Sequence, residues 1–222
     1  MKTQCIIFVL KNDEFFLIEN INKLVELQTD YDLYFVTRES KDRTSQILKF
    51  NHFVNIELSY DPGYYEALKS GFEFVKNLKY QIWIEFGECG RIELDEIKRL
   101  NEINKDYNYE KSVIFASRYI KNKKNKKRKL YIWFLVNIKI ADPYTRFKIY
   151  NSSSFLLIKN LFHCKIHPQD FLNLLYKQQD FIEVSTKCEK EKFSVTNFSE
   201  KFQLFIFSFL ILPFIKKFGR YK

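Results

Sequence analysis

The chain has 222 residues, 46% hydrophobic side chains and a formal net charge of +10, with a pI near 9.2. This length suits one α/β domain with a terminal extension, and the apolar content is enough to bury a sizeable core, so a largely disordered chain is excluded. The positive charge favours anionic partners such as nucleotide phosphates, acidic membrane surfaces or nucleic acid. Charge alone does not choose among these partners.

From the N-terminus to residue 118, short apolar runs alternate with segments of helical periodicity. Continuous apolar runs are typical of buried parallel strands. We predict strands over residues 5–10, 33–36, 54–58, 80–86 and 112–116, and helices over residues 13–27, 42–50, 64–78 and 93–104. Strands separated by helices of this length imply right-handed crossovers and a mainly parallel sheet, with ligands beyond the carboxyl ends of the strands.

Beyond residue 118 the pattern is less regular. Residues 121–129 hold seven positive side chains in nine positions, a density that keeps the segment solvated unless an anion is bound. This segment is either an enlarged surface loop or a contact for phosphate or acidic lipid. Nucleic-acid binding is disfavoured because no recognition motif or aromatic platform accompanies it. We predict an apolar helix or strand over residues 130–140, a strand over 146–150, and helices over 155–162, 171–176 and 181–188.

The cysteines and histidines do not indicate a metal site or a disulfide framework. The four cysteines are far apart and form no Cys-x-x-Cys pair. His163, Cys164 and His167 lie close together, but Pro168 follows at once and no second ligand pair has zinc-site spacing. The first residues also lack the long apolar core of a secretory signal, so we expect a reduced, cytoplasmic setting.

Residues 199–222 are predicted as a C-terminal element distinct from a domain over residues 1–198. The stretch 202–215 has only Gln203 and Ser208 as polar side chains and is flanked by lysines and an arginine. A helix that crosses a bilayer needs about 20 apolar residues, so a spanning helix is disfavoured. An apolar helix flanked by cations favours the surface of an anionic membrane, and the alternative is packing on the domain or on a dimer partner.

Five segments share their order and spacing with one known family. They are residues 6–14, a strand with an Asn-Glu turn; 35–44, in the frame of Asp-Asp-Gly-Ser-x-Asp-x-Thr; 61–72, a Gly-initiated helix start; 117–119, Ser-Arg-Tyr; and 142–150, in the frame of Asp-x-Thr-Ser-Gly-Phe-Arg-x-Tyr. In this order they resemble the family 2 glycosyltransferases of the GT-A fold, in particular the dolichol-phosphate or polyprenyl-phosphate sugar transferases. The resemblance implies a mainly parallel sheet flanked by helices, in a protein that transfers a sugar from a nucleotide-sugar.

The resemblance also implies roles for individual residues. These are nucleotide-sugar contacts by Asn12, Glu14, Thr37, Asp42, Gly63 and Lys69, phosphate contacts by Arg118 and Lys148, catalytic roles for Asp142 and Glu85, and a metal contact by Glu88. The metal would be Mg²⁺ or Mn²⁺ in an active enzyme. The expected partners are a nucleotide-sugar donor, a lipid-phosphate or glycan acceptor and the anionic inner face of the cell membrane, with no nucleic acid.

The family's acidic motifs are only partly kept. Its paired Asp after the second strand corresponds to Thr37 and Arg38, and its metal-binding Asp-x-Asp after the fourth strand corresponds to Gly87 and Cys89. Hard divalent cations prefer carboxylate oxygens, which these positions lack. The anion-binding side of the family pattern survives better than its metal-binding side.

Two functions therefore remain open. One is a glycosyltransferase in which cations, with or without a metal, stabilise the departing diphosphate. The other is a noncatalytic GT-A domain that acts as a binding or partner subunit. A cavity lined by Asp42, Glu85 or Glu88 would favour the enzyme, whereas a cavity filled by Arg38 and the tyrosines at positions 64–65 would favour the subunit.

Overall fold

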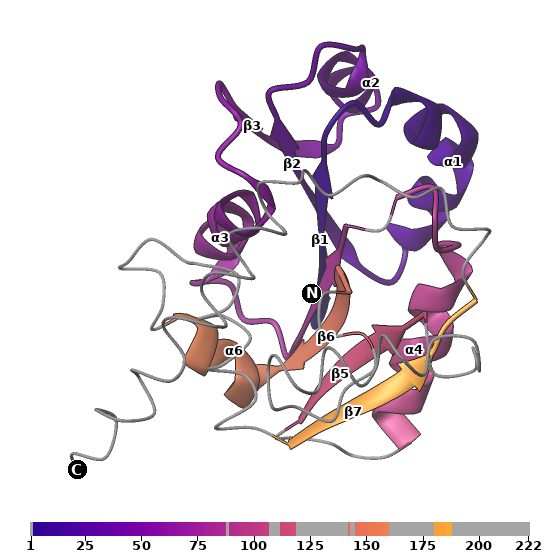
Figure 1. Cartoon of the computed structure of the whole chain (residues 1–222), viewed down its shortest axis with the longest axis vertical. Helices are drawn as coiled ribbons and strands as arrows, with labels where there is room; N and C mark the ends of the chain where they lie inside the picture. Colours follow the sequence, from indigo (N-terminus) through magenta and orange to yellow (C-terminus); the bar gives the residue numbers. More distant parts are fainter. Residues whose placement is uncertain are drawn as a thin grey trace, which may run out of the picture.

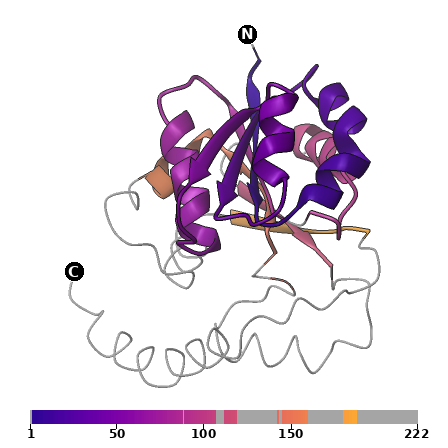
Figure 2. The same cartoon turned by 90° about the horizontal axis from the view of Figure 1, so that it is seen from above.

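The computed structural model describes residues 2–87, 89–106, 112–118, 142, 145–159 and 180–187. In these residues one seven-stranded sheet carries helices on both faces (Figures 1 and 2). The strands are β1 (Gln4–Leu10), β2 (Asp32–Arg38), β3 (Val54–Leu58), β4 (Ile82–Phe86), β5 (Ser112–Ser117), β6 (Phe147–Asn151) and β7 (Asp180–Ser185). The helices are α1 (Glu14–Leu27), α2 (Thr44–Phe50), α3 (Tyr64–Val75), α4 (Asp95–Asp106) and α6 (Ser152–Lys159).

The strand order is β3-β2-β1-β4-β6-β5-β7. β1 pairs in parallel with β2 and β4, β2 with β3, and β5 with β7. β6 is antiparallel to both of its neighbours, β4 and β5. The predicted mainly parallel sheet is confirmed, with β6 as the antiparallel exception. The strand order reverses between β1 and β4, which is the point where open α/β sheets bind ligands.

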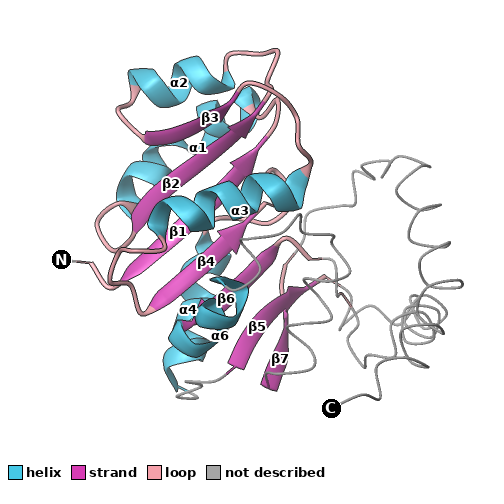
Figure 3. Ribbon diagram, turned by 90° about the vertical axis from the view of Figure 1, so that its left-hand side faces the viewer, coloured by secondary structure: helices cyan, strands magenta, loops and turns pink. Residues whose placement is uncertain are grey.

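Alternating side chains of β1 explain why this strand reads as a continuous apolar run. Cys5, Ile7 and Val9 belong to the core cluster on the face of α3 and α6. Ile6, Phe8 and Leu10 belong to the cluster on the face of α1, α2 and α4. Figure 3 shows α3 crossing in front of the sheet with α1 behind it. Because successive side chains point to opposite faces, a strand covered on both sides is typically a continuous apolar run, as β1 is from Cys5 to Leu10.

The helix predicted over residues 181–188 is wrong, because residues 180–185 form the strand β7. This strand pairs in parallel with β5 from Ser112↔Asp180 to Ser117↔Ser185. It lies at the sheet edge, and its side chains at 181–185 are all half-buried. An edge strand that is partly covered on both faces shows no clean apolar alternation, although its β-branched Ile182 and Val184 favour a strand.

The other predicted elements within the described residues are confirmed in type, with ends that shift by a few residues. The largest shifts are three residues: α6 begins at Ser152 and not at residue 155, and α3 ends at Val75 and not at residue 78. The predictions for residues 121–140, 171–176 and 199–222 lie outside the described residues, as does Glu88. Within the described part of the chain, no helix combines the length and hydropathy needed to cross a membrane.

Candidate functional site

A small cavity of about 150 Å³ lies beyond the carboxyl ends of β1, β2 and β4. Parallel strands that end at the same edge bring together residues far apart in the sequence. The lining residues are Val9, Lys11, Asp13, Arg38, Tyr64, Gly87, Cys89, Arg91 and Arg146. The cavity is therefore at the point where the strand order reverses, which is the expected ligand position of such a sheet.

Four of the lining side chains are cationic, and one, Asp13, is acidic. Two of the cations are held by Asp61, which lies just before α3. The Nε and Nη2 atoms of Arg38 lie 2.7 and 3.0 Å from its two carboxylate oxygens, and the Nζ atom of Lys11 lies 2.5 Å from Oδ2. The hydrogen bond from Arg38 is the main cause that holds the pKa of Asp61 well below its usual range. Asp61 thus stays ionised and orients the two cations.

Asp13 lies in the turn between β1 and α1. Its Oδ2 accepts a hydrogen bond from the backbone N–H of Lys11 at 2.7 Å, and its own N–H donates to Thr44 Oγ1 at 2.9 Å. Burial is the largest cause that raises the pKa of Asp13 to about 6. The cavity therefore contains one carboxyl group that changes its charge just below neutral pH.

Tyr64 fills the space beside Gly87, directly after β4. A Cβ atom built on Gly87 would lie 2.4 Å from Cε2 of the Tyr64 ring, so any other side chain there requires the ring to move. The guanidinium carbon of Arg146 lies 4.4 Å from the centre of the same ring, and the Gly87 N–H donates to the Arg146 carbonyl at 2.7 Å. The Tyr64 ring thus occupies the place where the resemblance puts the side chain of the first metal-binding Asp, and Arg146 lies over that ring.

The predicted catalytic Glu85 and the predicted phosphate-binding Lys148 are paired with each other. They are register partners in β4 and β6, both are fully buried, and the Lys148 Nζ lies 3.1 and 3.2 Å from the two oxygens of Glu85. Tyr64 and Tyr150 also donate their hydroxyls to Glu85. Burial, followed by the nearby Glu85 charge, raises the pKa of both tyrosines, so both stay protonated donors. Neither Glu85 nor Lys148 lines the cavity.

The predicted catalytic Asp142 and the predicted phosphate-binding Arg118 form a second pair. The Nε and Nη2 atoms of Arg118 lie 2.7 and 2.9 Å from the two oxygens of Asp142. The Asp142 carboxylate is buried, and its backbone N–H donates to Glu183 on β7. The structure places this pair at the end of β5 and not in the lining of the cavity.

Three predicted nucleotide-sugar residues, Asn12, Glu14 and Asp42, are brought together by two neighbouring turns. Asn12 Oδ1 accepts from the Lys41 N–H at 2.8 Å, Asp42 Oδ2 from the Glu14 N–H at 3.1 Å, and Glu14 Oε2 from the Arg43 N–H at 2.9 Å. These bonds tie the turn after β1 to the turn after β2. None of the three residues belongs to the lining of the cavity.

The remaining predicted contacts, Thr37, Gly63 and Lys69, are also absent from the lining of the cavity. Thr37 is buried and donates to Asn55 Oδ1 at 3.1 Å. Gly63 has a φ of +89° and donates its N–H to Asp61 Oδ1. This left-handed backbone favours glycine at the start of α3. The Nζ atom of Lys69 lies 3.9 Å from Oε2 of Glu66 on the same helix.

Sequence reasoning missed Lys11, Asp13, Arg91 and Arg146. Lys11 and Asp13 flank the predicted Asn12, and Arg146 lies two positions before the predicted Lys148. The available signal was positional. Lys11 directly follows β1 and Arg146 directly precedes β6, while Asp13 and Arg91 lie in the turns that follow β1 and β4.

The described residues do not fit a divalent metal. Hard cations take about six to eight oxygen ligands, mainly from carboxylates, yet Asp13 is the only carboxylate among the described residues that line the cavity. Within the described ranges no group of three or more His, Cys, Asp or Glu side chains could hold a metal ion. The donor set is cationic, and Tyr64 takes the space that a carboxylate at position 87 would need.

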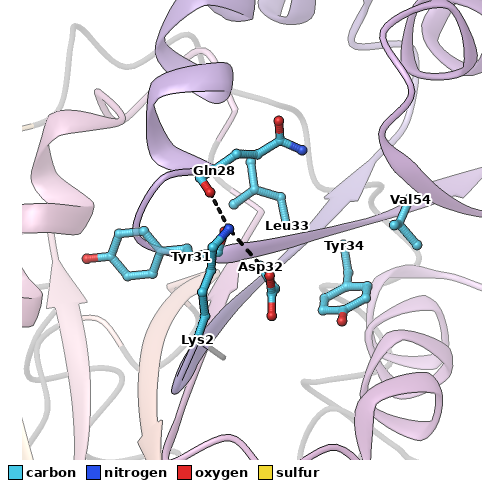
Figure 4. Close-up of a pocket in the computed structure, with 7 residues that line it drawn as sticks. All are labelled: Lys2, Gln28, Tyr31, Asp32, Leu33, Tyr34 and Val54. Atoms are coloured by element: carbon cyan, nitrogen blue, oxygen red, sulfur yellow. Dashed lines mark hydrogen bonds and ion pairs between the residues drawn. The ribbon is translucent and has the colours of Figure 1, made fainter.

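A second depression, of about 350 Å³, lies at the opposite end of β1 and β2 (Figure 4). Lys2 lies across it, with hydrogen bonds to the backbone oxygens of Gln28 and Tyr31 and an ion pair of 3.4 Å with Asp32. Its charged groups thus satisfy each other, and it lies at the amino ends of the strands. Ligands of such sheets bind at the carboxyl ends, so the smaller cavity is the candidate site.

No protein-family model matches the chain, and no curated protein sequence matches it. Several solved structures share its fold. Mannosyl-3-phosphoglycerate synthase from Rubrobacter xylanophilus has a TM-score of 0.64 at 10% identity, and the match covers 100% of this chain and 76% of that chain. Residues 1–349 of S. aureus TarS give 0.56 at 16% identity over 84% of this chain and 59% of that chain.

A mannosyltransferase from Pyrobaculum calidifontis, in complex with GDP-Man and Mn²⁺, also gives a TM-score of 0.56, at 10% identity over 82% of this chain and 55% of that chain. This chain thus spans little more than half the length of the TarS fragment and of this mannosyltransferase. At these identities the likeness shows the fold, which is the GT-A fold of these glycosyltransferases.

Proposed function

We propose that this chain binds a nucleotide-sugar by its diphosphate and transfers the sugar to a lipid-phosphate or surface-glycan acceptor. The observation that carries the proposal is the set of four cations around a cavity at the carboxyl ends of the central strands. Arginine offers a fork of donors and lysine a point charge to phosphate oxygens. Pockets for complete small molecules measure about 300–1,000 Å³, so the described cavity accounts for the phosphates and not for the whole donor.

The transfer requires a stabilised leaving group. An acceptor hydroxyl also requires a group that takes its proton, whereas a phosphate acceptor attacks through an oxygen that is already ionised near neutral pH. An acceptor oxygen forms a bond to the anomeric carbon, the bond from that carbon to the diphosphate breaks, and the diphosphate leaves with the bonding electrons. Cations that are already oriented lower the energy of the charge that develops on it. Asp13 is the lining carboxylate, and a pKa of about 6 suits it to accept the acceptor's proton near neutral pH.

A second candidate function is a GT-A domain that binds without transfer and acts as a partner subunit in glycan assembly. It is favoured by the presence in the lining of Arg38 and Tyr64, which are two of the three side chains expected to fill the cavity of a noncatalytic subunit. It is also favoured by Glu85 and Asp142, because both carboxylates are buried in ion pairs outside the cavity.

One experiment separates these functions. The full chain is titrated calorimetrically with UDP and GDP. The release of nucleoside diphosphate from UDP-sugars and GDP-mannose is then measured alone, with a polyprenyl phosphate and with a glycan that offers a free hydroxyl. Binding with acceptor-dependent release supports the transferase, whereas binding without release supports the subunit. Failure of every nucleotide to bind would contradict the transferase and favour a partner subunit. In the transferase, Asp13→Asn should keep nucleotide binding and lose most of the release that depends on a glycan hydroxyl, because that acceptor needs a base.

We also propose that the protein meets its acceptor at the cytoplasmic face of a membrane. The support is the apolar stretch at residues 202–215 and the cations that follow it. Such a segment suits the headgroup region of an anionic leaflet.

A further inference from the structure

The cavity has two features that come from different residues of the chain. One is the absence of carboxylates at positions 87 and 89, which are Gly87 and Cys89. The other is the convergence of Lys11, Arg38, Arg91 and Arg146, which come from the ends of four different segments. A site that had merely lost its metal-binding acids would retain neutral surroundings, and it would not gather four positive side chains.

We infer that these four cations hold the diphosphate of the nucleotide-sugar directly, in place of a divalent metal. The inference rests on the proposed function, because it concerns how the donor of that reaction is bound. A divalent cation in a diphosphate site neutralises the negative charge of the leaving group. Arginine and lysine supply the same neutralisation through charge-assisted hydrogen bonds. A metal ion added to this cavity would instead meet like charges on several sides.

The cationic lining is held in place by the core beneath it. Tyr64 donates its hydroxyl to Glu85 at 2.9 Å, and Glu85 is fixed by the buried Lys148. Arg146 lies over the Tyr64 ring, and its carbonyl accepts from Gly87. The tyrosine ring that excludes a side chain at position 87 is therefore anchored by a buried charge network. The lack of an acid at position 87 and the presence of Arg146 beside it are therefore supported by several buried residues.

Asp61 shows that two of the four cations, Lys11 and Arg38, are oriented before any ligand arrives. It holds Arg38 through two hydrogen bonds and Lys11 through one, while its own carboxylate is not part of the cavity lining. Lys11 and Arg38 come from the ends of β1 and β2. The other two cations come from the neighbouring strands, because Arg91 lies in the turn after β4 and Arg146 directly precedes β6. Preorganised donors of this kind lose little conformational entropy on binding.

The test is calorimetric titration of the full chain with UDP, GDP and inorganic pyrophosphate, once in EDTA and once with MnCl₂. We expect at least one nucleotide to bind in EDTA, with an affinity within about threefold of that in MnCl₂. Arg91→Gln and Arg146→Gln should each weaken this metal-free binding by about tenfold or more, because each removes charge-assisted hydrogen bonds. The matched control, Arg43→Gln, removes the same charge from a side chain that is 66% exposed and lies outside the cavity lining. It should change the affinity by less than about threefold.

Each outcome has a defined meaning. Binding that occurs only with MnCl₂ would overturn the inference and leave the proposed function standing. The absence of binding in both buffers would overturn both. Metal-free binding that Arg91→Gln and Arg146→Gln leave unchanged, in variants whose circular dichroism matches the parent, would show that the ligand is held elsewhere. The comparison of buffers uses the unmodified chain, so it does not depend on the folding of any variant.

Discussion

Glu85 illustrates how burial decides what an acidic residue can do. In the sequence it is a carboxylate at the end of a strand, in the neighbourhood of an expected metal site. In the structure it is fully buried and accepts hydrogen bonds from Lys148 and from two tyrosine hydroxyls. A carboxylate whose oxygens are already satisfied has little capacity for a ligand. Glu85 instead anchors the tyrosine that shapes the cavity.

Glu85→Gln should therefore act mainly on stability. The substitution leaves Lys148 as a buried cation without its counter-charge, and breaking a buried pair from one side costs about 3–5 kcal/mol in the free energy of unfolding. Urea denaturation of the full chain measures this loss. The control is Lys23→Gln, which breaks an ion pair with Asp95 whose side chains are 47% and 67% exposed and should cost less than about 1 kcal/mol. A similar small loss for Glu85→Gln would contradict the described network.

Asp13 should make the stability depend on pH in the opposite sense to an ordinary ion-paired acid. Its pKa is about 6 in the folded chain, above the usual 3.8, so the native state binds more protons than the unfolded state between these values. Ionised Asp13 therefore lowers stability, and the penalty is complete above about pH 6 and fades towards about pH 4. Asp13→Asn should stabilise the chain by roughly 2 kcal/mol near pH 7.5.

The measurement is the free energy of unfolding of both proteins across this pH range. The difference between Asp13→Asn and the parent should shrink as the pH falls and vanish near about pH 4. A difference that stays constant with pH would show that the carboxyl group does not carry a raised pKa.

At the scale of elements, α3 positions the site because it packs unusually close to the sheet. A Cβ atom on Gly71 would lie 2.7 Å from Cγ2 of Ile7 and 2.9 Å from Cγ2 of Val36. These side chains belong to β1 and β2, so the helix rests directly on the two central strands. The close approach sets where Tyr64, the first residue of α3, meets Gly87.

Gly71→Ala should destabilise the protein even though alanine is the better helix former. The gain in helix propensity is about 1 kcal/mol, whereas inserting a methyl group into a packed core costs about 1–3 kcal/mol. We expect a net loss of about 1 kcal/mol by urea denaturation. Ser70→Ala on the same helix removes a half-buried hydroxyl that donates to the Glu66 carbonyl and should be nearly neutral. If Gly71→Ala is as stable as the parent, the helix does not rest on the strands as described.

β7 marks the limit of predicting elements from local pattern. The central strands β1 and β2 can be predicted from the sequence, because both of their faces are covered and their apolar runs are continuous. β7 is covered on one edge only, by β5, and its identity as a strand depends on that long-range parallel pairing. A six-residue segment of intermediate burial contains no local signal strong enough to report such a partner.

At the scale of the whole molecule, part of the net charge of +10 is concentrated in two groups of cations. Part of it converges on the cavity, where four cations meet one carboxylate. Another part follows the apolar stretch at residues 202–215, where Lys216, Lys217, Arg220 and Lys222 lie. The first group suits a phosphorylated ligand, and the second suits an anionic surface.

The full chain should sediment with vesicles that contain phosphatidylglycerol and much less with neutral phosphatidylcholine vesicles. Replacing the four C-terminal cations with glutamine should weaken the vesicle binding by about tenfold or more, because each contributes about 1 kcal/mol near an anionic surface. High salt should weaken it as well.

The control for this prediction removes four exposed cations of the domain, Lys23, Arg43, Lys49 and Lys98. It changes the net charge equally and should retain most of the vesicle binding. Equal losses in both variants would indicate a general charge effect and would contradict a membrane contact at the C-terminus.

By itself, the sequence determined the type and order of most described elements and the mainly parallel sheet, because apolar periodicity is a local property of each segment. Only the tertiary structure decided which polar side chains form the site. Glu85 and Lys148 are 63 residues apart and neutralise each other inside the sheet, while Lys11, Arg38, Arg91 and Arg146 meet at its edge. Strand pairing selects these partners, and a one-residue change of register reverses the direction of every side chain, so local pattern cannot assign them.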